Sequence, residues 1–403
     1  MSEPAPPARA RVRDVFLVFL RLGFIGFGGP AAHVAMMREQ VVDRRKWIDD
    51  QHFMDMLGAT NLIPGPNSSE MTMHIGYVVA GWRGLLAGGL GFSLPAILMV
   101  IALAVLYTRF GSTPAVGFLL EGIKPVIIPI IAAALIKLTP KAVTGLLTGG
   151  VAAAALALYF LGVDNILLLL AGGLIVLVTA NLRRRASAPP AENAEAPGKP
   201  RSILLAPLAG LPAALASAMV PFSFLAMFLT FLKIGAVLYG SGYTLFAFLQ
   251  ADFVTRLGWL DESMLIDAIA VGQLTPGPIV TAATFLGYVM GAQQGGWLSG
   301  LFGALLATAG IYIPSYLAVA ISNPLIPRIR ASRWAGALLD GVNAAALGLM
   351  AAVTVQLALA AYTGPVHVAI GAAAAVALFA FNVPSIWLIL GGAAAGALLA
   401  LIG

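Results

Sequence analysis

The chain lacks cysteine and is poor in charged residues. With no cysteine among its 403 residues, disulfides and cysteine-ligated metal sites are excluded. Only 10% of the residues are charged, whereas about a quarter are charged in a typical soluble domain. Histidine is also scarce, and His33, His52, His74 and His367 show no metal-ligand spacing. The sequence therefore predicts no metal site and no cofactor, and it excludes an ordinary soluble protein.

Apolar residues dominate the chain instead. They make up 60% of it, and the mean hydropathy is +0.94. Runs of about 20 apolar residues, the length that crosses a bilayer, recur along the chain, for example at 85–107, 142–160 and 166–182. We therefore predict an all-α polytopic membrane protein that sits in a lipid bilayer. The net charge of +6 lies in short loops, where basic residues set membrane orientation, so it does not indicate nucleic-acid binding.

The sequence contains an internal repeat. Residues 19–23 (FLRLG) recur as 231–235 (FLKIG), about 212 residues later, and 62–66 (LIPGP) match 274–278 (LTPGP) in the same register. A later pair, LLEGIK ending at Lys124 and LLDGVN ending at Asn343, matches at an offset of about 219. Paired halves with Gly/Pro-interrupted apolar segments at matching positions are typical of secondary transporters.

The repeat divides the chain into five parts. Residues 183–202 are rich in Pro, Ala, Glu and Arg, which indicates a solvated linker. The predicted parts are a cytoplasmic N-terminal tail (1–14), a first repeat (15–182), the cytoplasmic linker (183–202), a connecting transmembrane helix (203–220) and a second repeat (221–403).

Basic residues predict how the halves are inserted. Loop 38–51 holds Arg38, Arg44, Arg45 and Lys46, whereas the equivalent loop 250–263 holds only Arg256. Because one of two equivalent loops is rich in Lys and Arg and the other is poor in them, we favour an inverted-topology repeat. Re-entrant broken helices then place the N-terminus in the cytoplasm and the C-terminus in the periplasm. Broken helices that cross the membrane completely would also explain the Gly and Pro residues.

The Gly/Pro interruptions are the candidate substrate site. Backbone that leaves the helix at membrane depth must be buried in protein or line a wet cavity, and the positive end of the next half-helix attracts anions. A kink that only serves packing is the alternative. The candidate binding residues are Gly28, Gly29, Asn61, Pro64, Gly65, Pro66, Asn67 and Ser68 in the first half, and Gly240, Ser241, Gln273, Thr275, Pro276, Gly277 and Pro278 in the second.

Basic residues inside apolar segments form a second set of binding candidates. Such charges are costly at membrane depth and usually face a partner or a watery path. Arg21 and Lys233 occupy equivalent positions and keep their sign, as an anion pathway requires, although both could instead extend to the membrane surface. Lys124 is a further binding candidate; alternatively it forms a structural ion pair with Glu121, one helical turn away.

Intramembrane carboxyl groups are the candidates for coupling to protons. Glu121 and Asp340 occupy equivalent positions, so both halves keep a carboxylate there. Glu70 follows the first Pro-Gly-Pro break and has no acidic counterpart, because Ala282 takes the aligned position. We therefore treat Glu70 as a lone additional coupling candidate.

These motifs resemble the chromate ion transporter family in its long-chain, two-domain form. The resemblance rests on residues 24–30 (FIGFGGP), 61–66 (NLIPGP), 272–278 (GQLTPGP) and 339–344 (LDGVNA). It implies a secondary active transporter that exports chromate across the bacterial inner membrane and confers chromate resistance. Sulfate has the same shape and charge and is a second expected substrate, and a homodimer is a further expectation.

Two alternatives remain open. A passive oxyanion channel could share the same architecture. Residues 63–69 (IPGPNSS) also resemble, weakly, the Pro-Gly-x-Ser-Arg loop of membrane polyprenyl-diphosphate phosphatases. Phosphatase chemistry needs an arginine and paired carboxylates, but this loop has no arginine and Glu70 stands alone. We therefore expect a transporter and not an enzyme.

Overall fold

The computed structural model describes residues 10–27, 30–60, 63–111, 113–186, 221–239, 242–323 and 333–402. These residues form helices joined by short turns, and no strand occurs among them, which confirms the predicted all-α class. Residues 187–220 hold most of the predicted linker and the whole predicted connecting helix, and they lie outside the described part of the chain.

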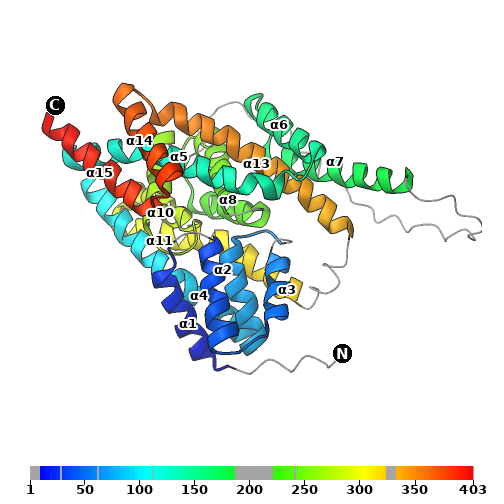
Figure 1. Cartoon of the computed structure of the whole chain (residues 1–403). Coiled ribbons are helices and arrows are strands. Elements are labelled where there is room, and N and C mark those ends of the chain that lie inside the picture. The colour runs from blue at the N-terminus through cyan, green and yellow to red at the C-terminus, as the bar shows by residue number, and fades with distance from the viewer. Residues whose placement is uncertain are drawn as a thin grey trace, which may run out of the picture.

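The two halves present the same elements in the same order (Figure 1). The first half contains α1 (Val12–Ile25), α2 (Pro30–Arg38), η1 (Glu39–Arg44), α3 (Asp50–Thr60), α4 (Asn67–Phe110), α5 (Pro114–Ala142), α6 (Leu146–Phe160) and α7 (Asn165–Ala186). The second contains α8 (Phe224–Val237), α9 (Leu245–Leu249), η2 (Gln250–Arg256), α10 (Glu262–Leu274), α11 (Thr281–Ser322), α13 (Arg333–Ala361), α14 (Pro365–Phe381) and α15 (Ser385–Ile402).

Each half begins with two interrupted helices, as predicted. α1 ends before Gly26 and α2 begins at Pro30; α3 ends at Thr60 and α4 begins at Asn67. The corresponding breaks in the second half separate α8 from α9 and α10 from α11. Both Pro-Gly-Pro segments are therefore non-helical and sit directly before a long helix.

α4 and α11 are helical hairpins rather than straight rods. Each reverses at a glycine with positive φ, Gly81 (φ 63°, ψ −153°) in α4 and Gly296 (φ 76°, ψ −159°) in α11, a conformation that glycine adopts at little cost. Their arms pack closely, because a Cβ added to Gly76 would lie 2.1 Å from the Gly84 carbonyl oxygen. The equivalent contact joins Gly291 to Ser299.

Helices of each half pack against helices of the other half. α5 packs against α14 and α15 of the second half, whereas α13 packs against α6 and α7 of the first (Figure 1). Glycines allow these close crossings: a Cβ on Gly122 of α5 would lie 2.1 Å from the Gly392 oxygen of α15, and one on Gly341 of α13 would lie 2.2 Å from the Gly172 oxygen of α7. The α4 and α11 hairpins pack against each other, and they pack against α1 and α8 respectively.

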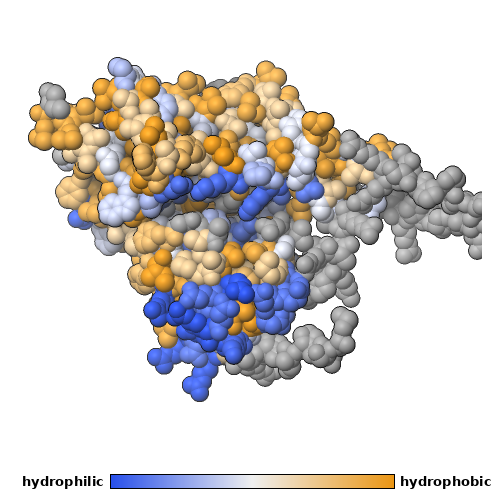
Figure 2. Space-filling model, in the orientation of Figure 1, coloured by the Kyte–Doolittle hydropathy of each residue, from blue (hydrophilic) through white to orange (hydrophobic). Residues whose placement is uncertain are grey.

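The surface matches a multi-pass membrane protein. Among the described residues, five helices are long and apolar enough to cross a bilayer: Asn67–Phe110, Val116–Ala142, Asn165–Leu182, Thr281–Ser322 and Gly336–Ala361. Large apolar side chains such as Trp82, Leu98 and Leu317 are more than half exposed. In Figure 2, hydrophobic residues cover much of the visible face, and hydrophilic residues gather at the lower end, around α1–α3. This distribution suits contact with lipid.

Candidate functional site

The breaks of the two halves are joined by a reciprocal pair of hydrogen bonds. The amide N–H of Gly65 donates to the carbonyl oxygen of Leu238 at 2.7 Å, and that of Gly277 donates to the carbonyl oxygen of Gly26 at 2.9 Å. In the repeat register Gly65 matches Gly277, and Gly26 matches Leu238. Each Pro-Gly-Pro segment is therefore held by the interrupted first helix of the other half.

His33 adds a further link at this junction. It is buried, and its Nε2 donates to the Gly26 carbonyl at 2.8 Å, so Nδ1 is left to accept from the Ser68 hydroxyl at 3.0 Å. Pro30, Pro66, Gly242 and Pro278, one from each break, line a small void of about 20 Å³ beside it. This role of His33 was not predictable from the repeat, because Leu245 stands at the equivalent position in the second half.

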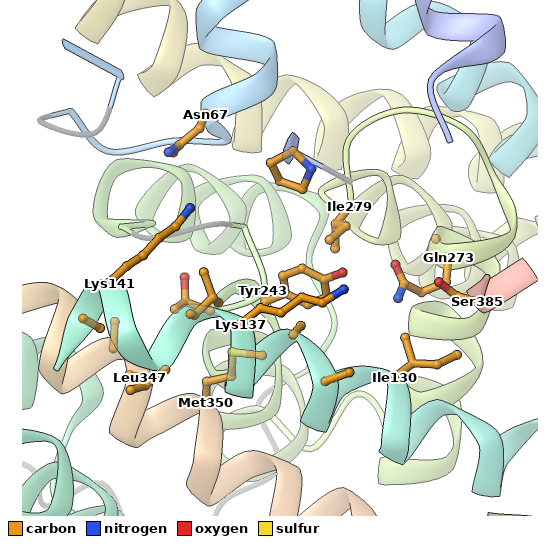
Figure 3. A pocket seen from close by; sticks show the side chains of 18 of the residues that line it. Asn67, Ile130, Lys137, Lys141, Tyr243, Gln273, Ile279, Leu347, Met350 and Ser385 are labelled. Atoms are coloured by element: carbon orange, nitrogen blue, oxygen red, sulfur yellow. The ribbon is translucent and has the colours of Figure 1, made fainter. Parts of the chain in front are cut away.

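A larger cavity of about 400 Å³ opens beside this junction, between the halves (Figure 3). Four of the predicted binding residues line it: Asn67, Gln273, Thr275 and Gly277. Both Pro-Gly-Pro regions therefore contribute to one space. The remaining lining comes from the first break of each half, the end of α3, and helices α5, α13, α14 and α15. Thr60, Tyr243 and Asn343 are among its other polar members.

Two lysines of α5 supply positive charge to the cavity. Lys137 and Lys141 lie one helical turn apart and both point into the cavity (Figure 3). Tyr243 and Gln273 also line the cavity and add a hydroxyl and an amide. Two ammonium groups with neighbouring amides and hydroxyls can attract and orient a small anion. These lysines were not among the predicted binding residues, because in the sequence they resemble ordinary cations that flank a loop.

Only the first half of the chain contributes these two positive charges. The positions equivalent to Lys137 and Lys141 in the second half are Gln356 and Ala360. Gln356 does not replace the charge, and its side-chain oxygen accepts a hydrogen bond from the Tyr159 hydroxyl at 2.6 Å. The cavity is thus asymmetric in charge although the backbone around it repeats.

Comparison with known proteins gives the family. A family model described as chromate transporter matches residues 13–177 and again 225–397. The chain belongs to the chromate transporter family. It is 31% identical over 372 residues to a chromate transport protein of Cupriavidus metallidurans, with 89% of this chain and 88% of the relative covered. It is also 31% identical over 360 residues to one of Pseudomonas aeruginosa, with 89% and 83% covered.

Membership of this family makes the chain a multi-pass transport protein and not an enzyme. A probable chromate transport protein of Synechococcus elongatus is likewise 31% identical over 342 residues, with 84% of this chain and 82% of the relative covered. No solved structure matches this transporter. In its described part, no cluster of three or more His, Cys, Asp or Glu side chains forms that could hold a metal ion.

The other predicted binding residues fall into two groups. Pro64, Gly65, Pro66, Pro276 and Pro278 form the non-helical turns themselves, and Ser68 binds His33. Five candidates lie outside the described residues of the transporter, namely Gly28, Gly29, Asn61, Gly240 and Ser241.

The predicted intramembrane cations lie away from the cavity lining. Lys233 forms an ion pair with Asp252, which also accepts from Arg256 at 3.0 Å. Arg21 lines a separate surface pocket with Arg44 and Arg45. Their place in an anion pathway stays a prediction.

The predicted coupling carboxylates differ sharply in their surroundings. Glu121 is exposed and pairs with Lys124 at 3.0 Å and with His367 at 3.2 Å, and Asp340 is also exposed. Glu70 is fully buried at the start of α4, and neither of its carboxylate oxygens has a hydrogen-bond partner. Of the three, Glu70 lies closest to a break, because a Cβ added to Gly65 would lie 2.0 Å from its Oε1 atom.

Proposed function

We propose that this protein is a secondary active transporter that exports chromate across the bacterial inner membrane and binds the oxyanion in the cavity between its halves. The observation that carries the proposal is the convergence of Lys137, Lys141 and both Pro-Gly-Pro regions on one cavity. The family and the names of its relatives support chromate as the substrate.

The cavity offers the groups that a tetrahedral dianion needs. Lys137 and Lys141 balance its charge, and Asn67 and Gln273 hydrogen-bond its oxygens. The Thr275 hydroxyl joins them by giving up its hydrogen bond to the Gly272 carbonyl. Charge-assisted hydrogen bonds of this kind contribute about 1.5–3 kcal/mol each. Sulfate presents the same shape and charge, so it competes for the same site.

The direction of transport follows from the orientation that the basic residues favour. Lys137 and Lys141 lie toward the end of α5 that the positive-inside rule places in the cytoplasm, so the cavity takes up the anion from that side. The reciprocal bonds Gly65–Leu238 and Gly277–Gly26 support a two-fold relation between the halves. An inverted repeat with a cytoplasmic N-terminus and a periplasmic C-terminus agrees with both observations.

Coupling through a carboxyl group distinguishes a pump from a passive channel. Glu70 is the favoured coupling residue, because its burial beside a break ties its charge state to the position of that break. Glu121 and Asp340 stay secondary candidates because both are exposed and Glu121 is already paired.

Uptake of labelled chromate into inverted membrane vesicles tests the proposal. Saturable accumulation against a gradient, reduced by excess sulfate and abolished by dissipating the ion gradients, is the expected result. Equilibration without accumulation would favour the passive channel. No uptake under any gradient would contradict chromate transport.

A further inference from the structure

A cluster of buried oxygen atoms lies on one side of the site and has no role in anion binding. It comprises Ser69 Oγ, both Glu70 oxygens, Ser93 Oγ, the Tyr312 hydroxyl and Ser315 Oγ, all buried and all without a hydrogen-bond partner in the described part of the chain. Buried polar atoms are almost always paired, so a group of unpaired ones needs an explanation.

Two oxygens of the cluster border the Gly65 break. A Cβ added to Gly65 would lie 2.0 Å from Glu70 Oε1 and 2.3 Å from Ser315 Oγ, so both atoms border the same small space. Tyr312 lies one helical turn before Ser315 on α11, and its hydroxyl approaches Ser69 and Ser93 without reaching hydrogen-bond geometry. All five side chains belong to α4 and α11, the two hairpins that contact each other.

Two members of the cluster have apolar counterparts in the other half. A Cβ added to Gly277 would lie 3.1 Å from the Ala96 side chain, and Ala96 matches Ser315 in the repeat. Ala282 matches Glu70. Because the backbone repeats and the oxygens of Glu70 and Ser315 do not, the fold does not require these two side chains.

The donor chemistry selects a cation of single charge. Glu70 provides one negative charge, the other donors are neutral hydroxyls, and no Lys or Arg of the described residues forms an ion pair with Glu70. Oxygen-only donor sets suit hard cations, and a monovalent ion neutralises a single carboxylate without excess charge. A carboxylate also repels an oxyanion, so this side of the junction cannot serve as a second chromate site.

We propose that Glu70 and Ser315 bind a sodium ion beside the Gly65 break. The proposal rests on the proposed transport function and identifies its coupling ion. Interrupted helices supply Na⁺ sites in other transporters through the same combination of unwound backbone and nearby oxygens. Since Gly65 is bonded to Leu238 of the other half, a cation at this point can alter how the halves meet.

The test measures Na⁺ binding without requiring transport. Purified protein is heated in NaCl or in KCl of equal ionic strength, and the Na⁺ concentration that half-maximally raises the unfolding temperature is determined. The variants are Glu70→Gln and Ser315→Ala. Asp164→Asn at the start of α7 is the control for a carboxylate, and Ser322→Ala on the same α11 helix is the control for a buried hydroxyl.

We expect Na⁺ but not K⁺ to stabilise the wild type, and each site variant to need at least tenfold more Na⁺, while both controls match the wild type. Equal stabilisation by K⁺, or an unchanged Na⁺ response in both site variants, overturns the sodium site. Should one variant fail to fold, the other still decides.

Chromate uptake into vesicles distinguishes a failure of the sodium site from a failure of the proposed chromate transport. Chromate accumulation that follows a pH gradient and ignores Na⁺ would overturn the sodium site and leave chromate export intact, with a proton on Glu70. Absence of chromate transport despite a Na⁺-selective thermal shift would overturn the proposed function alone.

Discussion

The Gly277 amide donates a hydrogen bond to the Gly26 carbonyl, 2.9 Å away in the other half of the chain. Gly277 has φ +103°, and a Cβ placed on it would lie 3.1 Å from the Ala96 side chain. The bond thus depends on a backbone conformation that glycine permits and other residues rarely adopt. It makes the second Pro-Gly-Pro turn a fixed part of the cavity wall.

Gly277→Ala should destabilise the protein by about 1–3 kcal/mol, because alanine is strained at this φ and crowds Ala96. Gly58→Ala is the matched control, since that glycine lies in α3 with nothing within 4 Å of an added Cβ. Thermal unfolding in detergent measures both. Equal unfolding temperatures for the two variants would refute the predicted strain.

The packing of helices between the two halves should depend on single glycines at the helix crossings. Gly122→Ala in α5 forces a methyl group against the Gly392 backbone of α15, so α5 and α15 must separate. We expect a lower unfolding temperature and less folded protein in the membrane. Gly117→Ala is the control on the same helix, because its Cβ would meet nothing within 4 Å. A wild-type yield of Gly122→Ala would show that this crossing is not needed.

His33→Leu places in the first half the residue that the second half carries at Leu245. It removes both hydrogen bonds of His33 and leaves Ser68 without its partner at a buried junction. Loss of such buried bonds costs about 1–3 kcal/mol, which a denaturant titration of detergent-solubilised protein can resolve. His52→Leu, at an exposed position in α3, should change stability little. Comparable losses of stability in the two variants would show that His33 is no more important than an exposed histidine.

Much of this architecture could be predicted from the sequence. The repeat, the helix breaks and the all-α class follow from apolar runs interrupted by Gly and Pro, which are local signals. Asn67 and Gln273 were found because they adjoin those breaks. The long-range pairing of Gly65 with Leu238 was not predictable, because it depends on how the two halves meet.

Other features of the structure have only an ambiguous signal in the sequence. Lys137 and Lys141 fit the positive-inside pattern equally well on a surface or in a cavity, and only the packing of α5 against the breaks decides between them. The reversals at Gly81 and Gly296 lie beside Arg83 and Gln294, where the sequence indicates the end of an apolar segment but not a tight hairpin. The unpaired oxygens around Glu70 come from both halves, so no single stretch of sequence reveals them.

Binding of labelled chromate to the purified protein tests the cavity most directly. Equilibrium dialysis would compare the wild type with Lys137→Gln, Lys141→Gln and the loop control Lys46→Gln, with sulfate as the competitor. Each cavity lysine should contribute a charge-assisted hydrogen bond, so each substitution should weaken binding roughly tenfold or more, while Lys46→Gln binds like the wild type. Unchanged chromate affinity in both cavity variants would contradict an oxyanion site between the halves.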